Sequence, residues 1–141
     1  MQTTYLDLKK EHSKEFNTFP MFFAFDKKQF EEGLAKIGAT KEDKLVHIGG
    51  GGYIKKDQLE AFKEMLERHN KQHQDNMVSD EEYTYHMVKY ELANHEYLVS
   101  YDLEPTLEAC NITKELLNAN TNLKTTVNKA IKDYKAENEM I

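Results

Sequence analysis

Apolar residues recur along most of the chain at the spacing of α-helices. The clearest case is Phe30, Leu34 and Ile37, which lie at positions i, i+4 and i+7 and so share one helix face. Asp26 precedes them as a candidate N-cap, and Gly38 follows where a left-handed residue would end a helix. These features predict a helix over 27–37. Similar patterns predict helices over 5–16, 58–75 and 80–98, short helices from Pro105 and Thr113, and a last helix from 121 or 122.

Two short apolar runs lack helical spacing and predict β-strands instead. The first covers residues 21–25, between Pro20 and Asp26. The second covers residues 45–48 and leads into four consecutive glycines, after which Tyr53 and Ile54 could form another strand. Four glycines are more than a two-residue hairpin turn needs, so a wide or bulged hairpin fits best. The alternative is a strand–loop–helix unit in which the glycines lead into a helix N-terminus.

Together these elements predict one α+β domain over residues 1–141. Its small antiparallel sheet or hairpin, from 21–25, 45–48 and 53–55, would pack against five or six helices. Residues 1–20 would form an arm that is mobile or packs late, and the tail 136–141 would fray. The helix over 58–75 carries an apolar stripe that includes Leu59, Phe62 and Leu66, and residues 75–78 would break it. The helix over 80–98 is apolar over a wide arc, which favours a central place in the core.

Composition narrows the functional classes. The chain has no run of about 18 apolar residues and no signal-peptide pattern, and its single cysteine cannot form an internal disulfide, so we expect a cytoplasmic protein without membrane contact. The net charge is -6, and residues 57–111 hold 13 acids against 4 bases. This acidic segment disfavours direct contact with nucleic acid and favours a basic protein surface as partner, with Glu60, Glu64 and Glu67 as candidate contacts. The alternative is a solvated helix face.

The glycine run is the first candidate ligand site. Backbone N–H groups in glycine-rich turns can cradle an anion, and lysines follow closely. The run fits neither a P-loop nor a dinucleotide-binding fingerprint. The alternative is a structural bulge or mobile loop. The residues of this candidate are His47, Gly49, Gly50, Gly51, Gly52, Tyr53, Lys55 and Lys56.

The second candidate is the pair Glu91 and His95, which lie at i and i+4 on one helix face. The pair could supply two metal ligands or an acid–imidazole couple, or it could simply make a surface hydrogen bond or anchor a neighbouring segment. Spacing fixes no third ligand, so we predict no metal, no cofactor and no catalytic residue. Cys110 lies among apolar residues and is expected to be a buried small side chain. We expect the glycine run and the Glu91–His95 pair to border one notch.

Two segments carry a resemblance to a known family. Ile-Gly-Gly-Gly-Gly-Tyr-Ile at 48–54 and Tyr-Glu-Leu-Ala-Asn-His-Glu-Tyr at 90–97 resemble small proteins of unknown function from bacteriophages, prophages and conjugative elements of Firmicutes and Bacteroidetes. The likeness spans roughly residues 21–118, leaving 1–20 and 122–141 outside it. It implies a mobile-element setting, where small accessory proteins often counter host defence.

Two functional hypotheses follow. The first is a non-enzymatic accessory protein that binds and inhibits a host macromolecule, such as a nucleic-acid-handling defence enzyme, in the manner of anti-CRISPR or other anti-defence proteins. The second is a binder of a nucleotide or other phosphorylated small molecule at the glycine run, with possible metal-assisted or enzymatic activity at Glu91 and His95.

Overall fold

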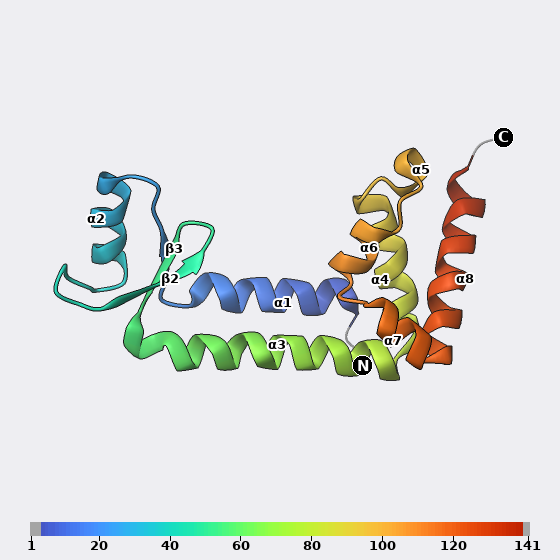
Figure 1. The fold of residues 1–141 in the computed structure, drawn as a ribbon, viewed down its shortest axis with the longest axis horizontal. Coiled ribbons are helices and arrows are strands. Elements are labelled where there is room, and N and C mark those ends of the chain that lie inside the picture. The colour runs from blue at the N-terminus through green and yellow to red at the C-terminus, as the bar shows by residue number, and fades with distance from the viewer. Residues whose placement is uncertain (1–3, 140–141) are drawn as a thin grey trace. The chain divides into compact units, whose positions relative to one another are not determined.

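The computed structural model describes residues 4–139, which contain eight α-helices and a three-stranded antiparallel sheet. The predicted α+β class is therefore confirmed, with more helices than the five or six expected. Residue contacts group the chain into two compact units (Figure 1). The sheet unit is residues 11–70, and the helical unit is residues 1–10 together with 71–141. Helices α1 (Tyr5–Thr18) and α3 (Leu59–Ser79) each contribute one part to either unit.

The sheet unit is built around strands β1 (Phe22–Phe23), β2 (Leu45–Gly49) and β3 (Gly52–Lys55), in the order β1-β3-β2. Phe22 pairs with Tyr53 across β1 and β3, and His47 pairs with Tyr53 across β2 and β3. The register shifts between His47 and Gly49, so the predicted bulged hairpin is present. A short 3₁₀ turn, η1 (Lys56–Gln58), then leads into α3.

Side chains alternate between the two faces of this sheet, and an apolar cluster packs on each face. One face packs Phe22, Leu45 and Tyr53 against α2 (Lys27–Lys36). The other face packs Val46 and Ile54 into a second apolar cluster with the end of α1 and the beginning of α3. The second cluster also contains Phe16, Phe19, Met21, Ile48, Leu59, Phe62 and Met65.

Local sequence signals determine both ends of α2. The Asp26 carboxylate accepts a hydrogen bond from the Gln29 N–H at 2.7 Å, as the capping pattern predicted. At the other end Gly38 is left-handed, with φ 68°, and the N–H of Ala39 reaches the carbonyl of Leu34 at 2.8 Å. This is the Schellman arrangement expected of a glycine that follows a helix.

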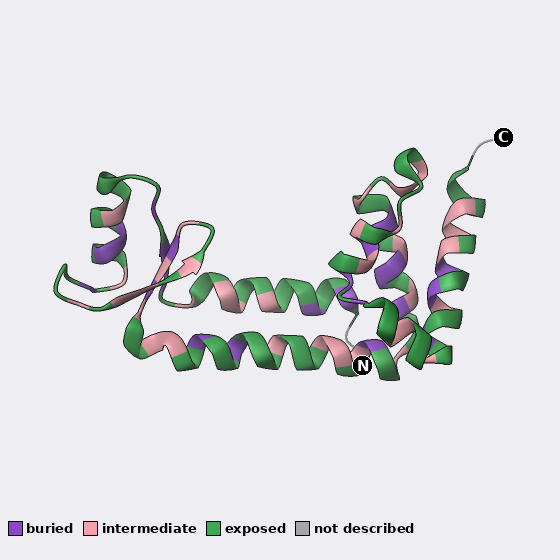
Figure 2. Ribbon diagram, viewed as in Figure 1, coloured by how far each residue is buried: buried purple, intermediate pink, exposed green. Residues whose placement is uncertain are grey.

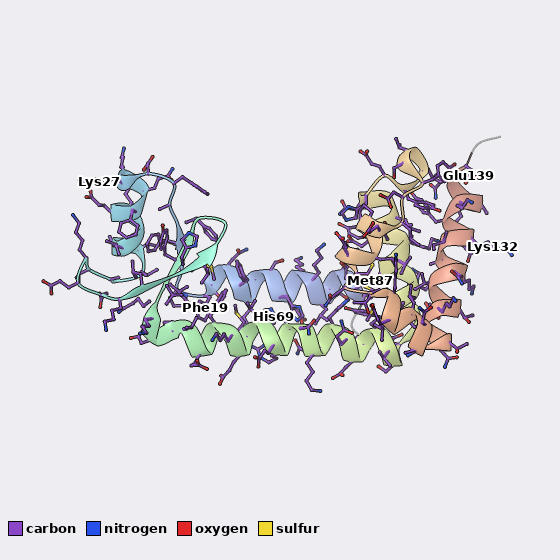
Figure 3. All side chains as sticks on the ribbon, viewed as in Figure 1. Phe19, Lys27, His69, Met87, Lys132 and Glu139 are labelled. Carbon is purple, nitrogen blue, oxygen red and sulfur yellow. The ribbon has the colours of Figure 1, made fainter. Side chains whose placement is uncertain are left out.

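The helical unit packs α4 (Glu81–Asn94) alongside α8 (Thr121–Asn138), with three short helices beside them (Figure 1). The short helices are α5 (Tyr97–Ser100), α6 (Glu104–Ala109) and α7 (Lys114–Ala119). Met87, Val88 and Leu92 of α4 are fully buried, which confirms the central place predicted for this segment. Figure 2 shows buried positions in α4, and Figure 3 labels Met87. Thr113 and Asn120 cap α7 and α8 with their side chains.

Several predicted boundaries are wrong, and the predicted N-terminal arm is packed where the structure describes it. Tyr5 and Leu8 are buried in the helical core, so α1 is not a mobile arm. Helix α3 does not break at 75–78 but continues to Ser79, whose hydroxyl donates to the carbonyl of Asp75. No glycine or proline interrupts that stretch, so nothing in the backbone stops the helix.

Two further details of α3 and α8 differ from prediction. Leu66 is 42% exposed, and Met65 takes its place in the apolar cluster beside Phe62. Helix α8 extends to Asn138, so residues 136–138 are helical, whereas residues 140 and 141 of the predicted fraying tail lie outside the described residues. Within residues 4–139, none of the helices combines the length and the apolar character that a membrane crossing requires.

Candidate functional site

The four glycines form the tip of the β2–β3 hairpin, and the backbone conformation there explains their presence. Gly49, Gly50 and Gly51 have φ values of 87°, 58° and 82°, a region that side chains other than glycine rarely adopt. A Cβ on Gly51 would also lie 2.5 Å from the ring of Phe25. The carbonyl of Gly51 accepts the N–H of Ala24 at 2.9 Å, which ties the tip to the end of β1. The glycine turn, Gly49–Gly52, is therefore a specified structural element of the sheet.

His47 supports this turn from the preceding strand. Its Nδ1 accepts the Gly49 N–H at 3.3 Å, so that nitrogen carries no proton. Its ring meets the edge of Tyr53 at a centroid distance of 4.9 Å and an interplanar angle of 89°. The Gly49 N–H is thus already engaged within the hairpin, which leaves one donor fewer for an anion.

Lys55 and Lys56 lie at the other end of the hairpin from the glycine turn, because Lys55 pairs with Leu45 at the base of the two strands. Together with Asp43, Lys44 and Asp57 they line a hollow of about 310 Å³. The Thr40 N–H donates to Asp43 and lowers the pKa of that carboxyl, and the charge of Lys55 adds to the effect. The hollow combines three cations with two carboxylates, so it is less selective for an anion than the lysines alone would suggest.

Glu91 is the centre of a buried polar cluster in the helical unit. Its side chain is 1% exposed, and Oε1 accepts the hydroxyl of Tyr5 at 3.2 Å. The same oxygen lies 3.5 Å from Lys9 Nζ, while Oε2 lies 3.2 Å from His95 Nε2. The predicted Glu91–His95 pairing is present. The other two partners of Glu91, Tyr5 and Lys9, belong to the first turns of α1. The cluster anchors the N-terminal residues of α1 to α4.

A second buried polar cluster, which sequence reasoning missed, lies nearby. His73 Nε2 donates to the carbonyl oxygen of Cys110 at 2.7 Å, and Nδ1 lies within hydrogen-bond distance of the Tyr83 hydroxyl at 2.8 Å. Burial raises the pKa of Tyr83, and burial together with the Glu91 charge raises that of Tyr5. Burial also raises the pKa of Cys110 to about 12, with Glu91 contributing. Cys110 is therefore a buried, unreactive thiol, as expected from its neighbours.

The only sequence signal for this second cluster is the position of His73 at the end of an apolar stripe. A histidine near a helix end is equally typical of a partner for the helix dipole, so its position indicates neither Tyr83 nor Cys110 as a contact. Among residues 4–139, no three His, Cys, Asp or Glu side chains come together as a set of metal ligands.

The two halves of the predicted notch belong to different units. The glycine turn, His47, Tyr53, Lys55 and Lys56 are in the sheet unit, whereas Glu91 and His95 are in the helical unit. Neither unit by itself holds both halves, so each half is a separate candidate site.

Glu60, Glu64 and Glu67 lie on one ridge of α3 in the sheet unit. Helical spacing puts them opposite Phe62, Met65 and His69, which face the interior. All three carboxylates are exposed, and no ion-pair partner for them occurs among the residues that the structure describes. We call these three residues the acidic ridge.

Comparison with protein families assigns the chain to a family over most of its length. A family model described as "Family of unknown function (DUF7659)" matches residues 4–133. The chain belongs to this family. Comparisons with curated proteins and with solved structures each find no match.

The family match is longer than the likeness inferred from sequence, which stopped at residues 21 and 118. It includes Tyr5 and Lys9 as well as Glu91, and so covers the anchored first turns of α1. It also covers the glycine turn and the acidic ridge. Membership alone names no activity for any of these features.

Proposed function

We propose that this protein is an accessory protein of a bacteriophage or other mobile element that acts in the host cytoplasm. It binds a host macromolecule without catalysing a reaction, and it inhibits that macromolecule. The target is a nucleic-acid-handling defence enzyme, which would make the protein an anti-CRISPR or other anti-defence factor. The mobile-element setting rests on the sequence resemblance, and the mode of action rests on the acidic ridge.

The acidic ridge supports this proposal because its three carboxylates are exposed and not neutralised by neighbours. With a rise of about 1.5 Å per residue, their spacing along the α3 axis is about 6 Å and then about 4.5 Å. The phosphates of one DNA strand are spaced by about 3.4 Å along the duplex axis, which is within a factor of two. A row of fixed negative charges of this kind can compete for the basic surface on which a defence enzyme holds its nucleic acid.

The two buried polar clusters, around Glu91 and His73, favour a binding function over catalysis because their acid and base groups are already engaged. Both carboxylate oxygens of Glu91 are occupied by Tyr5, Lys9 and His95, and both nitrogens of His73 are occupied as well. These groups hold the first turns of α1 and the last turns of α3 in the helical unit. They present no unengaged acid or base to a substrate.

A charge-reversal experiment tests the proposal. The variant Glu60→Lys, Glu64→Lys, Glu67→Lys should lose most capture of the host target and should no longer protect a phage from host defence. The matched control reverses three other exposed glutamates of the sheet unit, Glu11, Glu32 and Glu42, and should retain protection and most of the capture. Unchanged capture and protection with the ridge variant would refute a role for the acidic ridge.

The small-molecule alternative has less support, because the glycine turn and the two lysines are at opposite ends of the hairpin. It still predicts saturable binding. A thermal-shift panel of nucleotides and divalent metals tests it, and a shift that is lost in Lys55→Ala, Lys56→Ala would favour it over the inhibitor proposal.

A further inference from the structure

The connection between α4 and α6 has an unusual backbone. The short helix α5 is enclosed by two residues in the left-handed region, Glu96 with φ 53° and ψ 45° and Tyr101 with φ 55° and ψ 22°. Residues other than glycine rarely adopt this conformation, because it is strained for a side chain. Such strain persists only where the surroundings fix it, and it is concentrated at sites of function. We call residues 96–104 the α5 loop.

Hydrogen bonds within the loop hold its conformation. The N–H groups of Val99 and Ser100 donate to the carbonyl of Glu96 at 2.9 and 3.3 Å, and that of Tyr101 donates to the carbonyl of Tyr97 at 2.6 Å. The Ser100 hydroxyl accepts the Asp102 N–H at 3.1 Å. Tyr97 packs against the helical core and anchors the loop there. The loop is therefore preorganised, which reduces the entropy lost when a partner binds.

This rigid loop presents apolar side chains to solvent. Val99 is 81% exposed and Tyr101 is 56% exposed. The Tyr101 ring contacts Tyr97 at 5.6 Å and Lys135 Nζ at 5.9 Å, and its hydroxyl donates to the Glu139 carboxylate at 3.5 Å, so the side chain is held in place although it is half exposed. A single exposed valine would need no explanation. A tyrosine held on a hydrogen-bonded loop is the kind of anchor that dominates protein interfaces. Val99 adds exposed apolar area in the same loop.

The α5 loop itself carries three acidic residues and no basic one. Glu96, Asp102 and Glu104 are exposed within the loop, and none has an ion-pair partner in the described part of the chain. Lys135 is a cation beside the loop, where it lies over the Tyr101 ring and 4.0 Å from Glu139 (Figure 3 labels Glu139 at the end of α8). The surface is thus apolar at its centre and acidic around it.

We infer that the α5 loop docks a basic protein segment that carries an apolar side chain. Val99 and Tyr101 receive the apolar side chain, and Glu96, Asp102 and Glu104 attract the lysines or arginines beside it. This inference shares with the proposed function only the idea of a protein partner, and it concerns a different unit from the acidic ridge.

Synthetic peptides test this inference directly. The probe is a short fluorescent peptide of lysine and arginine with leucine and tryptophan, compared with one in which serine replaces the apolar residues and one in which glutamate replaces the basic ones. We expect the first peptide to bind at least roughly tenfold more tightly than either control, as judged by anisotropy. Equal affinity for the three, or no binding of the first, would overturn the inference.

Variants locate the binding on the loop. Val99→Ser and Tyr101→Asn should each weaken the first peptide by roughly tenfold or more. Asparagine tolerates the left-handed region, so Tyr101→Asn should fold with little change in Tm. Val78→Ser, at a valine of the helical unit that is 54% exposed, is the matched control and should bind like the wild type. Equal binding by Val99→Ser and wild type would refute the docking site. Unchanged capture of the host target by the ridge variant would instead bear only on the proposed function.

Discussion

Gly33 lies within α2, where alanine would ordinarily stabilise a helix by about 1 kcal/mol. Here the Phe22 ring is so close that a Cβ would lie 2.1 Å from its Cδ2 atom, and Phe22 is only 3% exposed. We predict that Gly33→Ala lowers the free energy of unfolding by about 1–3 kcal/mol, because overpacking outweighs the helix preference. Urea denaturation measures the change.

The matched control is Gly38→Ala, where φ is 68° but no atom lies within 4 Å of the added Cβ. Its cost comes from the backbone alone, at about 1–2 kcal/mol. In a Phe22→Leu background the penalty of Gly33→Ala should shrink while that of Gly38→Ala stays the same. A gain in stability from Gly33→Ala would contradict the close approach of Phe22.

At this scale the sequence predicts residues whose role is local. Asp26, Gly38 and Thr113 are recognisable because a cap or a left-handed turn depends on the few residues around it. Glu91 is different, because its burial depends on Tyr5 and Lys9, which are more than 80 residues away in sequence. Helical spacing could pair it with His95, but it could not show that the carboxylate is inside.

Among the elements, α1 and α3 are joined within the sheet unit by a polar clamp. The Glu15 carboxylate accepts two hydrogen bonds from the Arg68 guanidinium and lies 2.8 Å from His69 Nε2. The His69 ring also stacks on that of His12, with centroids 3.9 Å apart. Arg68, followed by His69, lowers the pKa of Glu15 from its ordinary value of 4.5 to about 2.

This clamp predicts a particular acid dependence. Because the folded-state pKa of Glu15 is depressed, its stabilising contribution is fully present above pH 4.5 and is lost as the pH falls toward 2. Glu15→Gln should therefore remove part of the fall in stability between these values, as measured by urea unfolding at a series of pH values. Glu11→Gln, at an exposed glutamate of the same helix, is the control. Equal pH dependence of Glu15→Gln and wild type would contradict the clamp.

Elements were predictable where the backbone signal was strong. The hairpin with its bulge, α2 and α8 follow from glycines, caps and apolar spacing, and they appear near their expected places. The end of α3 does not lie where it was predicted. Asp75 and Asn76 disfavour a helix only weakly, and the Lys71–Asp75 ion pair at 2.9 Å supports the helix there. The beginning of α3 is also not set by a side-chain cap, because Asp57 lies inside the 3₁₀ turn that precedes the helix.

For the whole molecule, the distribution of charge differs from what the linear sequence suggests. The sheet unit holds 11 acids and 10 bases, net -1, so the remaining residues of the chain carry -5 of the total of -6. The acidic ridge thus belongs to a nearly neutral unit, and most of the negative field comes from the helical unit. Long-range attraction of a basic partner depends on the total charge, whereas short-range contact depends on the ridge itself.

This separation predicts distinct kinetic effects for the two charge-reversal variants once the captured partner is purified. Each triple Glu→Lys change alters the net charge by the same amount, so both should lower the association rate constant to a similar degree. Raising the salt concentration should reduce the wild-type association rate by about tenfold or more, because the attraction is screened. Only the ridge variant should also raise the dissociation rate, since it alone removes charges in contact with the partner. Surface plasmon resonance measures both constants, and equal dissociation rates for the two variants would mean that the ridge attracts the partner without touching it.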